Sequence, residues 1–296
     1  MFKSGFVGII GRPNVGKSTL LNSIVGEKIA ITTHKPQTTR NRISGIKNVD
    51  QGQFIFLDTP GIHKATTSLN QYMVTTAVNT FSDVDLILLL IEANETLDPD
   101  DQCIIASLRD IKAPIVLIIN KIDLIEKERL LPIIDRLSRL HSFLEIVPIS
   151  ALKGFSVDTL LDVIWNILPE GPQFFPEDMI TDASERFLAA ETIREKITLL
   201  THQEIPYATA VMVDTFKEDE AKNLIRIQAT INVAKKSQKG IIIGKQGAML
   251  KRIGTQARCD MERFFASRVF LELFVRVRKD WTDDSRMLSE FGYKIT

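Results

Sequence analysis

An eight-residue segment near the start of the chain could grip a polyphosphate. Gly11-Arg12-Pro13-Asn14-Val15-Gly16-Lys17-Ser18 fits the pattern G-x-x-x-x-G-K-[S/T], between an apolar run at 6–10 and a helical pattern at 17–25. Glycines here let backbone N–H groups surround a β-phosphate, and the helix amino terminus adds positive potential. We expect Lys17 to bridge the β- and γ-phosphates and Ser18 to bind Mg²⁺. By itself the pattern also fits other P-loop enzymes, in particular a small-molecule kinase.

Two later motifs favour guanine over adenine. Asn120-Lys121-Ile122-Asp123 follows an apolar run at 115–119, and Ser150-Ala151-Leu152 follows a second run at 146–149. Asp123 offers two oxygens to the N1–H and N2–H₂ donors of guanine, which adenine lacks, so ATP would leave a buried carboxylate unpaired. We expect Asn120 to tether the base, Lys121 to cover the purine face, and Ala151 to donate its backbone N–H to O6. Ser-Ala-Leu alone also fits an ordinary loop.

A further motif suits a sensor of the terminal phosphate. Asp58-Thr59-Pro60-Gly61 directly follows the apolar run at 54–57. Asp58 could contact Mg²⁺ through water, and the Gly61 N–H could contact a γ-phosphate. The polar segment 32–40 must supply one threonine to Mg²⁺ when the γ-phosphate is present. We favour Thr39 over Thr38 because Thr39 directly precedes Arg40, as in related GTPases; a plain polar loop is the alternative.

Together the motifs predict a Mg²⁺-dependent GTP site. The expected catalytic residues are Lys17, Thr39 and Gly61, and the expected metal ligands are Ser18, Thr39 and Asp58. The expected nucleotide contacts are Gly11, Asn14, Val15, Gly16, Lys17, Ser18, Thr19, Asp58, Gly61, Asn120, Lys121, Asp123, Ser150 and Ala151.

One expected catalytic side chain is missing. Gly61 is followed by Ile62, where signalling GTPases carry a water-orienting glutamine, and an aliphatic group cannot polarise water. Slow intrinsic hydrolysis, or another group that orients the water, follows. Gly-x-Pro-Asn-x-Gly-Lys-Ser resembles the phosphate loop of potassium-activated GTPases, where an asparagine at the position of Asn14 helps to hold K⁺. A plain loop asparagine is an equal alternative.

Apolar runs and helical patterns alternate through the first part of the chain. Strands are expected at 6–10, 54–57, 86–91, 115–119 and 146–149, and helices at 17–25, 69–81, 100–110, 126–140 and 156–168. Such alternation indicates an α/β P-loop GTPase domain with a mostly parallel sheet and helices on both faces. Residues 42–49 are expected to add an antiparallel edge strand. Every motif then lies at the carboxyl edge of the sheet, where such folds bind ligands.

Three prolines and a glycine within residues 169–176 end this pattern. We expect a GTP-binding domain at 1–170, a linker at 171–183 and a second domain at 184–296 with a carboxyl-terminal extension. Its first helix is expected from Asp182, with Glu185 at capping-box spacing, to about Leu200. Strands at 209–216, 224–233 and 269–277 and a helical stretch at 248–265 give the order α-β-β-α-β, or α-β-β-α-α-β if Gly254 divides that stretch.

The second domain carries a candidate nucleic-acid site. The segment from Lys235 to Lys279 contains twelve basic and three acidic residues, a net charge of +9. The rest of the chain therefore carries a net charge of −9. Within this block, Ile241–Lys251 resembles the core of a KH RNA-binding domain, whose G-x-x-G loop approaches the phosphates of about four unpaired nucleotides. The split-helix order matches the α+β, type II KH topology. A solvated basic face is the alternative. The expected RNA contacts are Ile243, Gly244, Lys245, Gln246, Gly247 and Lys251.

Over its full length the chain resembles the Era-type GTPases of the TrmE-Era-EngA-like family, bacterial KH-domain GTPases of small ribosomal subunit assembly. Beyond the motifs above, the resemblance rests on residues 35–40, 175–178, 184–187 and 193–196. It implies a GTPase that assists 16S rRNA maturation and small (30S) subunit assembly and binds the 3′ end of 16S rRNA. It also implies a cytoplasmic protein with peripheral association with the inner membrane. Potassium-stimulated hydrolysis and a monomeric state are further expectations.

The composition is that of an ordinary soluble protein, with 44% apolar and 25% charged residues and no apolar run of membrane-spanning length. Cys103 and Cys259 are expected to be reduced core thiols, and the four histidines show no metal-ligand spacing. Two rival functions stay open. One is an RNA-binding assembly scaffold with a structural nucleotide. The other is a tRNA-modification GTPase, which would call for a carboxyl-terminal cysteine and a cofactor domain.

Overall fold

The chain forms two compact units in the computed structural model, which describes residues 1–62, 65, 67–94 and 96–293. The last three residues of the predicted second domain therefore lie outside the described range. The first unit comprises Met1–Ala30, Thr39–Ala65 and Met73–Asp182. The second unit includes Ile31–Thr38 and the carboxyl-terminal part from Ala183 onward.

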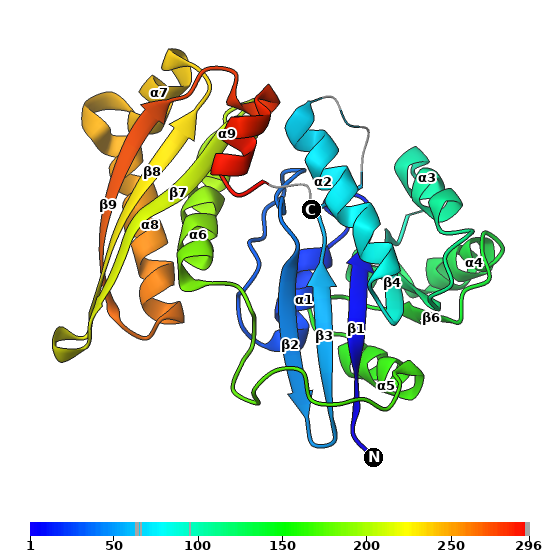
Figure 1. Ribbon diagram of the computed structural model, residues 1–296. Helices are drawn as coiled ribbons and strands as arrows, with labels where there is room; N and C mark the ends of the chain where they lie inside the picture. The colour runs from blue at the N-terminus through cyan, green and yellow to red at the C-terminus, as the bar shows by residue number, and fades with distance from the viewer. Residues whose placement is uncertain (63–64, 66, 95, 294–296) are drawn as a thin grey trace. The chain divides into compact units, whose positions relative to one another are not determined.

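The first unit is built on a six-stranded sheet of order β2-β3-β1-β4-β5-β6 (Figure 1). Only β2 runs antiparallel, beside β3, and the other neighbours pair in parallel. The parallel strands are apolar on both sides, as expected of strands covered on both faces. The bounds are β1 Lys3–Ile10, β2 Ile43–Val49, β3 Gly52–Asp58, β4 Leu86–Glu92, β5 Ile115–Asn120 and β6 Glu145–Pro148. The α/β P-loop architecture and the antiparallel edge strand predicted from the sequence are confirmed.

Helices connect these strands and pack against the sheet to form the apolar core. Alternate residues of β4 and β5, such as Leu89 and Leu117, pack against apolar residues of α3 and α4, such as Ile104 and Ile133. Each right-handed crossover returns the chain to the same edge of the sheet, so the loops after β1, β3, β5 and β6 gather there. The helix bounds are α1 Lys17–Val25, α2 Ser68–Asn79, α3 Pro99–Ser107, α4 Lys127–Ser138 and α5 Val157–Ile167.

The segment predicted as a linker packs against the first unit. Gln53 on β3 is fully buried and accepts the backbone N–H groups of Phe174 and Phe175 at 2.9 Å each. The Ile46 N–H of β2 donates to the Ile180 carbonyl at 2.8 Å. The chain therefore follows the β2–β3 edge up to Asp182 before it enters the second unit.

The second unit is an α+β fold with a three-stranded sheet of order β7-β8-β9. β7 is antiparallel to β8, and β9 is parallel to β8. Its core lies on one sheet face, against apolar residues spaced four apart on α6 (Ala189, Ile193, Ile197) and α8 (Ile253, Ala257, Met261). The bounds are α6 Glu185–Leu200, β7 Thr209–Asp219, β8 Leu224–Val233, α7 Lys236–Ile243, α8 Ala248–Phe264, β9 Arg268–Val277 and α9 Ser285–Glu290. The order α-β-β-α-α-β agrees with the predicted type II KH topology.

Three local predictions were wrong. The amino cap of α6 is Ser184, whose Oγ accepts from the Phe187 N–H at 3.3 Å, and not Asp182, which accepts from the Ser44 hydroxyl. Gly254 lies inside α8, and the two helices are divided at Gly244–Gly247, because the left-handed φ angles there cannot continue a helix. Cys103 is exposed, so it is not a core thiol.

Candidate nucleotide site and nucleic-acid interface

The loop between β1 and α1 is shaped for a phosphate chain. Gly16 has φ 104°, and a Cβ there would stand 2.2 Å from the Asn120 side-chain nitrogen, so only glycine fits. The Lys17 ammonium is buried and donates to the carbonyls of Gly11 and Arg12 at 2.9 Å each. Burial lowers the pKa of Lys17 to about 8, and the nearby Asp58 opposes this shift. The lysine is thus held inside the loop, where a phosphate would meet its charge.

Three oxygen-bearing side chains meet at the carboxyl end of β3. The Ser18 hydroxyl donates to Asp58 Oδ2 at 2.6 Å, and Thr39 Oγ1 lies 2.8 Å from Ser18 Oγ and 3.3 Å from Asp58 Oδ2. Thr38, in contrast, donates its hydroxyl to the Lys35 carbonyl at 2.7 Å. The geometry therefore brings Thr39, and not Thr38, beside the two other expected metal ligands.

Asp58 fits a cation site. Its side chain is fully buried, and its Oδ1 has no hydrogen-bond partner among the residues that the structure describes. Burial raises the pKa of Asp58 to about 6, although Lys17 and the hydroxyls of Ser18 and Thr39 favour the charged form. A buried, unpartnered carboxylate oxygen next to two hydroxyls is a donor set that suits the hard cation Mg²⁺.

The guanine motifs are tied to the phosphate loop through Asn120. Its side-chain amide donates to the Val15 carbonyl at 2.7 Å, and its oxygen accepts the Ala151 N–H at 3.0 Å. The Ala151 N–H was expected to read guanine O6, so that contact would have to share or replace the bond to Asn120. Asp123 follows in an exposed turn, and Lys121, at φ 66°, leads into that turn. Ser150 is fully buried and caps the loop through the Lys153 N–H at 3.2 Å.

Gly61 and Ile62 lie against the phosphate loop. A Cβ on Gly61 would stand 2.6 Å from the Pro13 nitrogen, and the Ile62 N–H donates to the Gly11 carbonyl at 3.3 Å. The Ile62 side chain packs against the apolar core of the first unit. It cannot orient water, as the sequence predicted.

Sequence reasoning missed an ionic cluster around Arg12. The guanidinium lies 3.0 Å from Glu92, 3.2 Å from Asp101 and 3.8 Å from Asp98, and Glu92 also pairs with Lys121 at 3.2 Å. Burial raises the pKa of Asp101 to about 6, while Arg12 favours its charged form. The cluster joins the phosphate loop to β4, α3 and the guanine motif. Its members are up to 109 residues apart along the chain, Arg12 to Lys121, so no local spacing signals it.

Helix α6 of the second unit holds the segment Ile31–Thr38. Arg194 donates to the Thr38 carbonyl, Glu195 accepts the Thr32 N–H at 3.1 Å, and Lys35 donates to the Thr198 carbonyl at 2.6 Å. Arg194 and Glu195 are almost fully buried, and Arg194 also pairs with Glu191. The boundary between the units falls between Thr38 and Thr39.

The Gly244–Gly247 loop connects α7 to α8 and is shaped to present its backbone. Gly244, Gln246 and Gly247 all have left-handed φ angles, of 71°, 51° and 79°. A Cβ on Gly244 would stand 2.8 Å from the Met249 Cβ. Lys245, Gln246 and Lys251 are exposed, while Ile243 is half-buried. The first N–H groups of the 17-residue helix α8 follow directly, a favourable place for phosphate.

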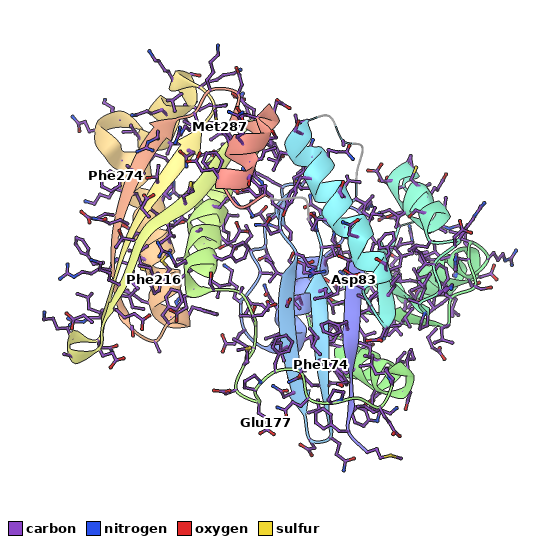
Figure 2. The ribbon with its side chains drawn as sticks, in the orientation of Figure 1. Asp83, Phe174, Glu177, Phe216, Phe274 and Met287 are labelled. Carbon is purple, nitrogen blue, oxygen red and sulfur yellow. The ribbon has the colours of Figure 1, made fainter. Side chains whose placement is uncertain are left out.

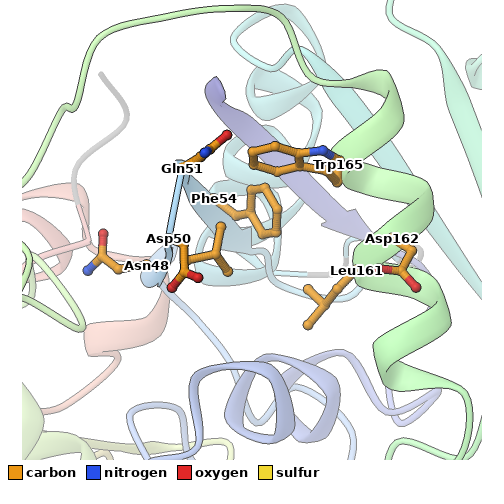
Figure 3. Close-up of a pocket in the computed structure, with 8 residues that line it drawn as sticks. Asn48, Asp50, Gln51, Phe54, Leu161, Asp162 and Trp165 are labelled. Atoms are coloured by element: carbon orange, nitrogen blue, oxygen red, sulfur yellow. The ribbon is translucent and has the colours of Figure 1, made fainter. Parts of the chain in front are cut away.

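A groove of about 680 Å³ lies elsewhere, at the β2–β3 turn and α5 (Figure 3). The rings of Phe54 and Trp165, 6.1 Å apart, line it together with Asp50 and Asp162. It contains none of the residues predicted to bind nucleotide, and it lies at the opposite ends of the strands from the phosphate loop. Among the described residues, no group of three or more His, Cys, Asp or Glu side chains forms a metal site, and no helix is long and apolar enough to cross a membrane.

Comparison with known proteins agrees with this geometry. Residues 6–121 match the family model "50S ribosome-binding GTPase", and residues 204–282 match the KH domain. The chain is 69% identical to GTPase Era of Syntrophus aciditrophicus, over 99% of this chain and 96% of that protein. It is 58% identical to GTPase Era of Geobacter metallireducens, over 99% and 98%.

Two solved structures are also similar over the full length. One is Era from Aquifex aeolicus bound to GDP·AlF₄⁻, with a TM-score of 0.96 and 43% identity over 99% of this chain and 100% of that one. The other is Era in complex with MgGDPNP and nucleotides 1506–1542 of 16S ribosomal RNA, with a TM-score of 0.96 and 43% identity over 100% of both chains.

Proposed function

Because this chain belongs to the GTPase Era family, we propose that it is a GTP-hydrolysing switch that binds the 3′ end of 16S rRNA and assists maturation of that RNA and assembly of the 30S subunit. The similar Era structure in complex with nucleotides 1506–1542 of 16S rRNA supports the choice of RNA. The observation that carries the proposal is the meeting of Ser18, Thr39 and the unpartnered Asp58 oxygen beside Lys17. This arrangement supports a cation site next to the phosphate loop.

Each residue of the site has a separate role in the proposed phosphoryl transfer. Ser18 and Thr39 would ligate Mg²⁺, and Asp58 would hold it through a water molecule. When bound, this ion neutralises charge on the β- and γ-phosphate oxygens. Lys17 would add a second positive charge from inside the loop, and the Gly61 N–H would donate to the γ-phosphate. Asn120 keeps the guanine motifs and the phosphate loop in fixed register, because it binds both Val15 and Ala151.

The attacking water needs a partner other than Ile62. Asn14 supports a potassium site, since it stands in the exposed part of the loop at φ 65° and the loop sequence matches that of potassium-activated GTPases. A cation held there would supply charge near the transferred phosphoryl group. Hydrolysis should be faster in K⁺ than in Na⁺, and Asn14→Ala should abolish the difference. Equal rates of the wild-type protein in both salts would contradict the site.

The structure suggests how nucleotide state reaches the RNA-binding unit. Thr39 lies beside Ser18 and Asp58, and the preceding residue, Thr38, accepts a hydrogen bond from Arg194 of α6. Release of Thr39 after hydrolysis would therefore loosen the segment that α6 holds. A difference in RNA affinity between the GTP-analogue and GDP forms tests this switch. Equal affinities would favour the rival scaffold with a structural nucleotide.

We further propose that residues 1–170 form the GTP-binding domain, residues 171–183 the linker and residues 184–296 the RNA-binding domain. The match of residues 204–282 to the KH domain supports ribosomal RNA as the substrate of the switch. Crosslinking in cells followed by sequencing of the bound RNA tests this choice. Reads concentrated at the 3′ end of 16S rRNA are expected, and reads concentrated on tRNA would contradict it.

A cytoplasmic location, a peripheral association with the inner membrane and a monomeric state stay predictions from the family resemblance. Fractionation of cells with and without a high-salt wash tests the first two. Light scattering of the purified chain tests the third.

A further inference from the structure

The sheet of the second unit has an outer face, opposite to the face that packs against α6 and α8. Along β8, Ile225, Ile227 and Ala229 are buried in the core, so Arg226, Gln228 and Thr230 lie on the outer face. The strand register sets Lys217 of β7 and Phe270 of β9 on either side of Arg226. It sets Phe274 of β9 beside Thr230.

Two aromatic rings stand exposed on this outer face. Phe270 is 47% exposed and Phe274 is 52% exposed, and Phe274 is labelled on β9 in Figure 2. They are four residues apart on one strand, so they share a face at a separation of about 13 Å. Their neighbours in the core-facing register, Val269 and Leu271, already contribute to the apolar core. Stability of the fold therefore does not account for two large apolar rings in solvent.

The charges around the rings are mainly positive. The Arg226 guanidinium lies 5.5 Å from the centre of the Phe270 ring, and the exposed Lys217, Arg268 and Arg276 share the outer face. Three acids share this face. Asp214 accepts a hydrogen bond from Thr230 at 2.6 Å, Glu272 accepts one from Gln228 at 2.9 Å, and Asp219 pairs with Lys222 at 3.1 Å. The four basic groups thus outnumber three acids, each of which is already engaged with a neighbouring side chain.

We propose that this outer face is a second contact surface for single-stranded RNA, distinct from the Gly244–Gly247 loop. Bases would stack on Phe270 and Phe274, and phosphates would meet Arg226, Lys217 and Arg276. RNA suits the face better than a protein surface does, because every nucleotide brings both a flat π system and an anion. The inference rests on the proposed function, since it assumes that the chain binds RNA.

The two contact surfaces lie on different parts of the unit. The Gly244–Gly247 loop joins α7 to α8, and α8 covers the core-facing side of β9. RNA that fills only the loop, about four nucleotides, would not reach the rings on the other side of the strand. The outer face should therefore contribute to the affinity only for a longer RNA strand. Comparing the affinities for short and long oligonucleotides distinguishes the two surfaces.

The experiment compares two double variants of the full chain with the wild type. Phe270→Leu/Phe274→Leu keeps apolar side chains but removes the flat rings, and Phe270→Tyr/Phe274→Tyr keeps the rings. Binding is measured by fluorescence anisotropy with single-stranded RNA of about four nucleotides and of roughly sixteen nucleotides. Stacking on an aromatic ring contributes roughly a factor of five to a hundred per base, so the leucine variant should bind the long RNA at least about tenfold more weakly. It should bind the short RNA like the wild type, and the tyrosine variant should bind both like the wild type.

Each other outcome overturns the inference. Wild-type affinity of the leucine variant for the long RNA would mean that the face serves another purpose, such as contact with a protein. Equal loss for both lengths would mean that the rings support the fold or the loop, and thermal melting of the variant would show which. If the wild type binds neither RNA, the proposed RNA-binding function itself fails.

Discussion

In the proposed nucleotide site, we expect Asp58 to act in its ionised form and Lys17 in its protonated form. Asp58, with a pKa near 6, must be ionised to face Mg²⁺, so activity should fall as the pH drops below about 6. Lys17, with a pKa near 8, must be protonated to face phosphate, so activity should fall as the pH rises above about 8. The kcat/KM for GTP reports ionisations of the free enzyme, and we expect it to be bell-shaped between these limits.

Two variants show which residue causes the decline of kcat/KM at low pH and which causes the decline at high pH. Lys17→Arg keeps its charge at all accessible pH values, so its lower activity should no longer decline above about pH 8. Asp101 also has a pKa near 6 but lies at Arg12, so Asp101→Asn should keep the acidic limb. Loss of the acidic limb in Asp101→Asn would assign it to the Arg12 cluster and not to Asp58.

We expect Asp123 to determine the choice of base. Asp123→Asn replaces an acceptor by an amide that can donate to the C2 carbonyl of xanthine. Removal of a charged hydrogen-bond partner costs roughly 1.5–3 kcal/mol, so GTP affinity should fall by about ten- to a hundredfold and XTP should bind. Asp135→Asn, an exposed acid of α4 paired with Arg139, is the control and should leave both affinities unchanged. Unchanged GTP affinity in Asp123→Asn would contradict the assignment.

At the scale of elements, the α7–loop–α8 hairpin should carry RNA binding independently of GTP hydrolysis. Lys245 and Gln246 are exposed, and the flanking glycines set the loop shape. Lys245→Asp/Gln246→Asp puts negative charge beside the phosphates and should remove most RNA affinity, while stability changes by less than about 0.5 kcal/mol. Basal GTP hydrolysis should survive. Filter binding and turnover measurements check the two parts.

A matched control uses the same change of charge at the other end of the sheet. Ala221→Asp/Lys222→Asp lies in the exposed turn between β7 and β8, which Figure 1 shows at the opposite end of the sheet from α7. This variant should lose only a small part of the RNA affinity, through the general field of the unit. Equal loss in both variants would mean that the basic block binds RNA without a defined site.

At the scale of the whole molecule, Arg194 should transmit nucleotide state to RNA affinity. It is buried, and it joins Glu191 to the Thr38 carbonyl. Arg194→Lys keeps the charge but loses the forked geometry, so the ratio of RNA affinities between GTP-analogue and GDP forms should shrink toward one. GTP affinity itself should change little. Arg139→Lys, in an exposed pair on α4, is the control and should keep the wild-type ratio. An unchanged ratio in Arg194→Lys would contradict the route through α6.

The sequence by itself determined the fold class and the nucleotide. Each motif is a short run of fixed spacing directly after a strand of continuous apolar residues, as at 115–119 before Asn120. Local spacing and strand periodicity depend on neighbours in the chain, so they can be read without the fold. The KH loop was recognised for the same reason, because Gly244 and Gly247 are only three residues apart.

Only the tertiary structure decided the contacts between distant segments. The meeting of Thr39 with Ser18 and Asp58, the ion cluster of Arg12 and the bond from Arg194 to Thr38 join residues up to 156 positions apart. The exposed face of β9 was equally invisible, since Phe270 and Phe274 alternate with core residues and read as an ordinary strand. Such contacts depend on strand order and on which face a helix covers, and these follow from packing of the whole chain, which no local pattern encodes.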